Sequence, residues 1–210
     1  MASRRIRFEG LIAGLLVLLA SGPALAHHPM GGKLPGTLTE GLLSGFGHPI
    51  IGFDHLAAVI AVGCLSALHP SGIRLVPGYV VAMIVGVVLH TQGATLPAAE
   101  TLVALSVVAL GAVMVWSRPL AAAIALALFA VTGLLHGYVL GEAIIGAERT
   151  PLLAYFIGLA AVQTVVAAAA LFAVRLFVDP AARGFAPMRL VGAGIACVGL
   201  VALAPQLLPG

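Results

Sequence analysis

The sequence predicts an all-α integral membrane protein, in which a cleavable signal peptide precedes a six-helix transmembrane bundle with a periplasmic N-terminus. Of its 210 residues, 61% are hydrophobic and only 8% are charged, whereas a soluble domain typically has about 25% charged residues. The hydrophobic residues form runs long enough to cross a bilayer. With so little charge, most of the protein surface must contact lipid. The formal net charge of +3 therefore reflects membrane topology and does not indicate nucleic-acid binding.

Residues 1–26 have the three parts of a secretory signal peptide. Three arginines among the first seven residues precede an apolar stretch that is shorter than the ~20 residues of a spanning helix. An Ala-x-Ala cleavage site ends at Ala26. Cleavage there leaves His27 and His28 at a new N-terminus, where we expect them to capture a divalent ion. Residues 27–210 then form one six-span transmembrane permease domain, and an uncleaved signal anchor is the alternative for residues 1–26.

Six hydrophobic runs are candidate spans, and short segments rich in Pro, Gly and Arg separate them. They cover residues 45–68, 74–92, 99–116, 119–141, 151–177 and 188–207. Because the connections are short, neighbouring helices should pack antiparallel. Ala and Gly dominate 121–130 and 158–170, which permits close approach of helix backbones. Whether the chain also assembles as a homo-oligomer stays open.

The basic residues predict the orientation of the bundle. If the mature N-terminus is periplasmic, the cytoplasmic segments carry Arg74, Arg118, Arg175, Arg183 and Arg189. The periplasmic segments then carry only Lys33 and Arg149. This asymmetry follows the positive-inside rule, and it agrees with the orientation that a signal peptide imposes. The sequence therefore predicts a multi-pass protein of the bacterial inner membrane.

Nearly all ionisable side chains within the predicted spans lie near the periplasmic face. The outer half of the first span contains His48, Asp54 and His55, and the fourth span ends with His136 and Glu142. His90, Glu100 and Glu148 lie at the same side. The amide of Gln163 lies deeper, in the fifth span. Ionisable residues inside a membrane are costly and usually mark a functional site.

The residue types at this face are those of a divalent-metal site. His48 and His55 are seven residues apart, which predicts one helix face for both. Imidazole together with carboxylate suits Ni, Co, Zn or Fe better than Ca or Mg. Glycines beside these residues predict an irregular backbone, which is tolerated in a membrane where it lines a cavity. The expected ligands are His48, Asp54, His55, His136, Glu142 and Glu100, with His90, Glu148, Gln163, His27 and His28 as further candidates.

Two strings of the sequence resemble the HupE/UreJ family. The string from His48 to Leu56 resembles the His-x5-Asp-His signature of that family, and the string from His136 to Glu142 resembles the His-Gly motif in its fourth helix. The resemblance implies a nickel permease for hydrogenase or urease maturation, with some members handling cobalt, and it points to the same six ligands. The chain departs from the family pattern at Leu140, where many relatives have a second histidine.

These observations favour inward transport of Ni²⁺ by facilitated diffusion. A permease for Co²⁺, Zn²⁺ or Fe²⁺ is the alternative within the same class. A membrane-embedded accessory protein that binds metal without translocating it is an alternative of another class. An intramembrane zinc hydrolase is disfavoured because the sequence has no His-Glu-x-x-His string. We therefore expect a transporter and not an enzyme.

Overall fold

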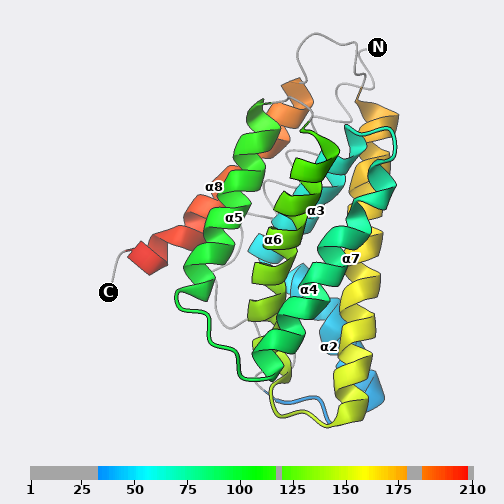
Figure 1. Ribbon diagram of the computed structural model, residues 1–210, viewed down its shortest axis with the longest axis vertical. Helices are drawn as coiled ribbons and strands as arrows, with labels where there is room; N and C mark the ends of the chain where they lie inside the picture. The colour runs from blue at the N-terminus through cyan, green and yellow to red at the C-terminus, as the bar shows by residue number, and fades with distance from the viewer. Residues whose placement is uncertain (1–32, 117–119, 179–185, 208–210) are drawn as a thin grey trace.

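The computed structural model describes residues 33–116, 120–178 and 186–207, and every regular element in these ranges is helical. The helices in chain order are α2 (Leu38–Ile51), α3 (Phe53–Ala67), η1 (Gly72–Arg74), α4 (Val76–Thr91), α5 (Ala99–Trp116), α6 (Ala122–Leu140), η2 (Gly141–Ile144), α7 (Arg149–Phe177) and α8 (Ala186–Leu207). They form one elongated bundle (Figure 1). The expected signal peptide, with His27 and His28, lies outside the described residues.

Five helical segments are long and apolar enough to cross a membrane, and α2 with α3 makes a sixth if this bent pair is one span. The five are Gly72–Thr91, Ala99–Trp116, Ala122–Ile144, Arg149–Phe177 and Ala186–Leu207. They agree closely with five of the predicted spans. An all-helical membrane protein with five to six spans is thereby confirmed.

The first span differs in its bounds from the run predicted over residues 45–68, and the irregular backbone expected within it is a sharp break. It begins earlier, at Leu38, and bends by 81° between α2 and α3. Pro49 has no N–H to continue the helical hydrogen bonds, and Gly52 takes an extended conformation, with φ −75° and ψ 100°. The chain therefore leaves the helix at Gly52 and starts a new one at Phe53.

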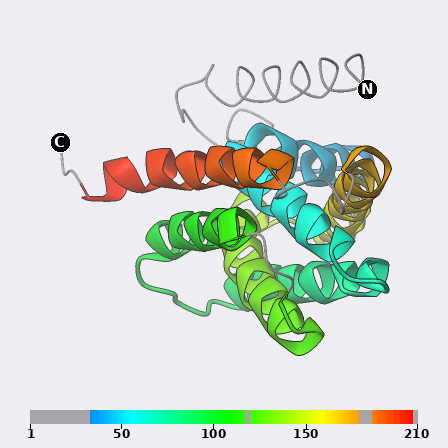
Figure 2. The same cartoon turned by 90° about the horizontal axis from the view of Figure 1, so that it is seen from above.

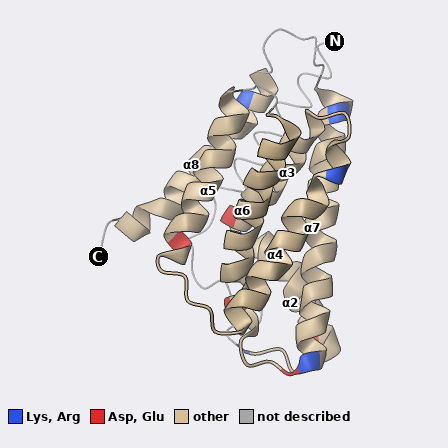
Figure 3. Ribbon diagram, viewed as in Figure 1, with Lys and Arg blue, Asp and Glu red and all other residues tan. Residues whose placement is uncertain are grey.

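The helices alternate in direction, so charged residues far apart in the sequence meet at the two ends of the bundle. Arg74, Arg175 and Arg189 lie at the end that holds the α3–α4 and α7–α8 connections, whereas the acidic residues lie in the middle and at the other end (Figure 3). The Arg175 guanidinium donates to the carbonyl oxygens of His69, at 2.6 Å, and of Pro70. This contact ties the end of α7 to the loop after α3.

Glycines let the helices approach until their backbones touch. The most extensive pairings are α4 with α6, α5 with α8, and α2 with α7. Between α4 and α6, a Cβ added at Gly137 would lie 1.9 Å from the carbonyl oxygen of Met83, and one at Gly133 would lie 2.3 Å from that of Tyr79. Seen from above, α8 lies beside α5, and its C-terminal part extends past the other helices (Figure 2).

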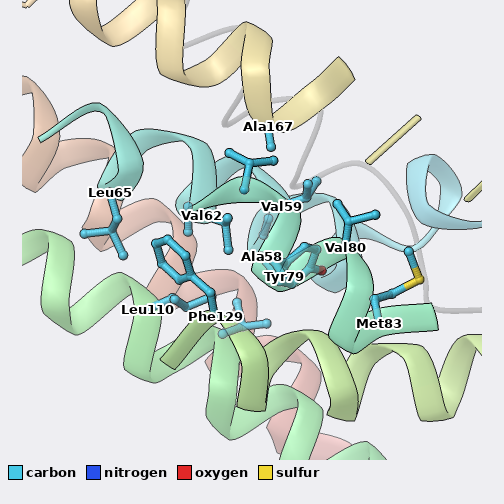
Figure 4. Packing of buried hydrophobic residues seen from close by; sticks show 14 of the residues in the cluster. Ala58, Val59, Val62, Leu65, Tyr79, Val80, Met83, Leu110, Phe129 and Ala167 are labelled. Carbon is cyan, nitrogen blue, oxygen red and sulfur yellow. The ribbon is translucent and has the colours of Figure 1, made fainter. Parts of the chain in front are cut away.

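An apolar layer fills the bundle between the broken helix and the arginine-rich end. Val59 and Val62 of α3 pack there with Leu110 of α5 and Phe129 of α6, and each is at most 1% exposed (Figure 4). Val59 and Val62 follow His55 by one and two turns of α3. On α6, which runs antiparallel to α3, Phe129 precedes His136 by two turns. The layer therefore separates these histidines from the arginine-rich end.

Candidate metal centre

The break at Gly52 determines where the string from His48 to Leu56, the first of the two family motifs, lies. His48 belongs to the last turn of α2, and Asp54 and His55 to the first turn of α3. The expectation that His48 and His55 share one helix face is therefore wrong, because the 81° bend lies between them. Their rings nevertheless lie close, with centroids 6.2 Å apart and planes at 73°. The two rings are therefore brought together by the bend and not by the repeat of a regular helix.

Gly52 also allows the His55 ring to pack directly against the backbone. A Cβ at Gly52 would lie 2.7 Å from His55 Cδ2 and 3.3 Å from Asp54 Oδ1, so any larger residue there would force the His55 ring to shift. The Asp54 carboxylate accepts a hydrogen bond of 2.8 Å from the backbone N–H of His55. The broken helix therefore holds the carboxylate and the imidazole in a compact arrangement.

A hydrogen-bonded chain links three helices at the centre of the bundle. His55 Nδ1 of α3 lies 2.7 Å from His136 Nδ1 of α6, and the two ring centroids are 4.9 Å apart. His136 Nε2 lies 3.0 Å from the hydroxyl oxygen of Ser106 on α5. Both histidines are at most 1% exposed. The two motifs far apart in the sequence thus form one buried cluster.

Tyr155 of α7 connects His48 to the end of α6. Its hydroxyl donates to the carbonyl oxygen of Leu140 at 2.6 Å and lies 3.4 Å from His48 Nδ1. Sequence reasoning missed both Tyr155 and Ser106. Ser106 could have been noticed, because it is the one polar residue after Thr101 in the apolar run of α5. Tyr155 gives no such signal, since a tyrosine near the membrane interface is common.

The predicted carboxylates of the later helices lie apart from this cluster. Glu100 is exposed in the first turn of α5, Glu142 is exposed in η2, and Glu148 is the exposed residue before α7. All three lie away from the arginine-rich end, in the part of the bundle that we call the acidic end. Because they are exposed, they can attract cations through solvent but do not belong to the buried cluster.

His90 is engaged with its neighbours in α6. Its ring stacks on Tyr138, with centroids 4.1 Å apart and planes at 11°, and its Nδ1 hydrogen-bonds to the Tyr138 carbonyl oxygen. The Tyr138 hydroxyl donates to Ala94 O at 2.8 Å and accepts from Leu96 N at 2.9 Å. His90 therefore helps to hold the loop between α4 and α5 against α6.

Gln163 is fully buried in α7, and neither atom of its amide has a hydrogen-bond partner among the described residues. Thr132 of α6 is fully buried with its hydroxyl in the same situation. Thr132 precedes His136 by one turn of α6, on the side of the apolar layer. Gln163 precedes Ala167 by one turn of α7, and Ala167 packs against Gly63 of α3. Both polar groups thus lie about one turn, ~6 Å, beyond the histidine cluster.

No group of three His, Cys, Asp or Glu side chains in the described ranges is already arranged to hold a metal ion. The His55–His136 separation of 2.7 Å between nitrogens is a hydrogen-bond distance. Two nitrogens bound to one ion at 2.0–2.1 Å in tetrahedral geometry would lie ~3.3 Å apart. The cluster has the donor types of a divalent-metal site, but its two rings are hydrogen-bonded to each other. They must move apart before both can bind the same ion.

A bundle of helices long and apolar enough to cross a membrane defines a multi-pass membrane protein, and buried imidazoles at a broken span are typical of transporter sites. The chain belongs to the HupE/UreJ family, because the family model described as "HupE / UreJ protein" matches residues 15–202. The family is linked to nickel uptake for hydrogenase or urease, and its members are transporters and not enzymes.

The chain is also similar to "Protein HupE" of Rhizobium leguminosarum bv. viciae. The two are 35% identical over 121 residues, which cover 57% of this chain and 61% of that relative. The chain thus spans about three fifths of the length of this curated relative. No solved structure matches the chain.

Proposed function

We propose that this protein carries Ni²⁺ inward across the bacterial inner membrane by facilitated diffusion and supplies it for maturation of hydrogenase or urease. The observation that carries the proposal is the cluster of His48, Asp54, His55 and His136, which is buried where α2 and α3 break. Buried imidazoles and a carboxylate inside a membrane bundle are costly, and such residues usually mark a functional site. Family membership supports nickel as that cargo.

In the proposed orientation, the acidic end of the bundle faces the periplasm. Glu100, Glu142 and Glu148 then attract cations to the outer mouth, and the arginine-rich end faces the cytoplasm as the positive-inside rule requires. His55 lies about 18 Å along α3 from its end at Ala67. The binding cluster therefore lies in the outer half of a bilayer whose apolar core is ~30 Å thick.

Uptake of radioactive Ni²⁺ into proteoliposomes that contain the purified protein tests this function. We expect saturable uptake, with Co²⁺ as the strongest competitor and Zn²⁺ or Fe²⁺ weaker. If Co²⁺ or Zn²⁺ is taken up in preference to Ni²⁺, the alternative permease is correct. Binding of Ni²⁺ without flux would instead establish a metal-binding accessory protein.

Acidification of the outer solution is expected to inhibit uptake. Metal ligands bind in their deprotonated forms, so protons compete with the ion for the imidazoles. Affinity should therefore fall as the external pH is lowered, because a protonated imidazole cannot bind the ion. The four side chains of the apolar layer, Val59, Val62, Leu110 and Phe129, carry no titratable group that could pass a proton on. Uptake at varied external pH with the membrane potential clamped is the measurement, and stimulation by acid would instead indicate proton symport.

Gln163→Leu is expected to raise the stability of the protein and to lower its Ni²⁺ uptake. Removing a buried amide without partners relieves a cost of about 1–3 kcal/mol, so the melting temperature in detergent should rise. If the amide assists an ion that leaves the histidine cluster, Ni²⁺ uptake should fall several-fold. Thr164→Val is the control, because Thr164 is exposed on the same helix and its hydroxyl bonds to Ala160 O. A stabilised variant with undiminished uptake would show that Gln163 takes no part in transport.

A further inference from the structure

We infer that Tyr79, Thr132 and Gln163 form a second and weaker binding site, the polar layer, which receives the ion when it leaves the histidine cluster. Its ligand is a divalent cation that keeps part of its water shell. None of the three residues belongs to the two family motifs. The inference deepens the proposed function and rests on it for the direction of transport.

All three side chains are fully buried, and their polar atoms lack partners within the protein. The hydroxyls of Tyr79 and Thr132 and both amide atoms of Gln163 have no hydrogen-bond partner among the described residues. Buried polar side chains in native proteins nearly always have a partner, so each exception needs an explanation such as a bound water or ion. These groups are therefore free to bind a ligand that does not belong to the chain.

Thr132 and Tyr79 lie at the same depth on neighbouring helices. Thr132 precedes His136 by one turn of α6, toward the arginine-rich end. The next residue, Gly133, packs directly on α4, where a Cβ at Gly133 would lie 2.3 Å from the carbonyl oxygen of Tyr79. Both residues are therefore about one turn, ~6 Å, beyond the histidine cluster.

Gln163 lies at that depth on α7. A Cβ at Gly63 of α3 would lie 2.2 Å from the carbonyl oxygen of Ala167, so these two residues are level. The two helices run in the same direction, because both end at the arginine-rich end. Gln163 is therefore level with Val59, which follows His55 by one turn.

An ion that moves from the histidines toward the arginine-rich end next reaches the polar layer. Beyond it, the described parts of α3, α4, α6 and α7 carry no charged side chain before Arg74 and Arg175. Hydroxyl and amide groups both donate and accept hydrogen bonds, so they can bind the water molecules around a hydrated ion. The polar layer can therefore hold such an ion at the border of the apolar layer.

The chemistry of the polar layer suits release of the ion better than its capture. Imidazole is a better ligand for Ni²⁺ than an uncharged oxygen, so the polar layer should bind the ion more weakly than the histidine cluster does. A site on a permeation path must be favourable enough to enter and weak enough to leave. A strong site followed by a weaker one lets the ion leave the histidines in two small steps.

Tyr79→Phe, Thr132→Val and Gln163→Leu each remove the polar group and keep a side chain of similar shape. The maximal rate of Ni²⁺ uptake into proteoliposomes should fall about fivefold in each variant, the effect of one net hydrogen bond to the water shell of the ion. The half-saturation concentration should not rise. Isothermal titration of the full chain in detergent should show unchanged Ni²⁺ affinity, because the histidine cluster is intact. The melting temperature should not fall, since a buried polar group without a protein partner has been removed.

Ser66→Ala is the matched control. The Ser66 hydroxyl is also fully buried without a hydrogen-bond partner among the described residues, but Ser66 lies near the end of α3 and packs against Gly72 of η1. Its uptake should equal that of the unaltered protein.

Unchanged maximal rates in all three variants would overturn the inference, and so would an equal loss of rate in Ser66→Ala. A loss of Ni²⁺ affinity as large as the loss of rate would also overturn it, because the three groups would then serve the histidine cluster. If the unaltered protein carries Co²⁺ or Zn²⁺ instead, the same comparison with that ion decides the inference. An unaltered protein that carries none of these ions would refute the proposed function, and the polar layer as a transport site with it.

Discussion

His55→Ala is expected to abolish Ni²⁺ uptake, with a loss of about 100-fold or more, while the amount of protein in the membrane stays normal. Replacing second-shell partners of a metal typically costs 10–100-fold in affinity, and a direct ligand should cost at least as much. His55 is 1% exposed and lies between His48 and His136, with ring centroids at 6.2 Å and 4.9 Å. Removing it therefore disconnects the two motifs as well as deleting a ligand. Initial uptake rates, normalised to immunodetected protein, are the measurement.

His69→Ala is the matched control for this experiment. His69 lies in the loop after α3, at the arginine-rich end, and Arg175 binds its backbone carbonyl oxygen, which an alanine retains. Its uptake should equal that of the unaltered protein. His48→Ala and Asp54→Asn should resemble His55→Ala, because these side chains share the broken helix. Near-normal uptake in all three variants would refute the site.

Replacing an exposed carboxylate should reduce uptake much less than replacing His55, because the carboxylates are surrounded by solvent and His55 is buried. Glu142→Gln should weaken apparent affinity only a few-fold at low ionic strength, because an exposed charge attracts ions through solvent and is screened by salt. A loss as large as that of His55→Ala would mean that η2 moves and delivers Glu142 into the cluster.

Much of the fold could be predicted because hydrophobic run length and turn residues are local signals. The run predicted as 99–116 matches α5, and the run predicted as 151–177 begins two residues after α7 does. The bend at Gly52 could not be predicted in the same way. Pro and Gly also occur inside continuous membrane helices, so their presence predicts irregularity but not an angle of 81°.

The members of the candidate site could be predicted better than its geometry. Motif chemistry selected His48, Asp54, His55 and His136, which are buried, but also Glu100 and Glu142, which are exposed. The contact between His55 and His136 depends on how α3 packs on α6, which is a tertiary property that no spacing within either motif contains. For the same reason, the hydrogen bond between His136 and Ser106 and the contact of Tyr155 with His48 emerge only from the packed bundle.

Gly137→Ala is expected to reduce both folded protein and uptake, and the loss of uptake should be the larger. The new Cβ would lie 1.9 Å from the Met83 carbonyl oxygen, so α6 must move away from α4 by about 1 Å or more to restore a normal contact. Forcing extra volume into a packed interior typically costs about 1–3 kcal/mol. Because Gly137 follows His136 directly, the same displacement changes the 2.7 Å contact between His136 and His55.

Gly36→Ala is the control for this substitution, since a Cβ at Gly36 meets its nearest neighbour at an ordinary 3.7 Å. Melting temperature in detergent and uptake per molecule of membrane protein should both stay normal in that variant. In Gly137→Ala the melting temperature should fall by several degrees, and the protein that remains folded should transport poorly, because the close approach of α4 and α6 holds His136 in place. Normal uptake per folded molecule, despite a lowered melting temperature, would show that the cluster tolerates movement of α6 and that His136 is not held by this helix contact.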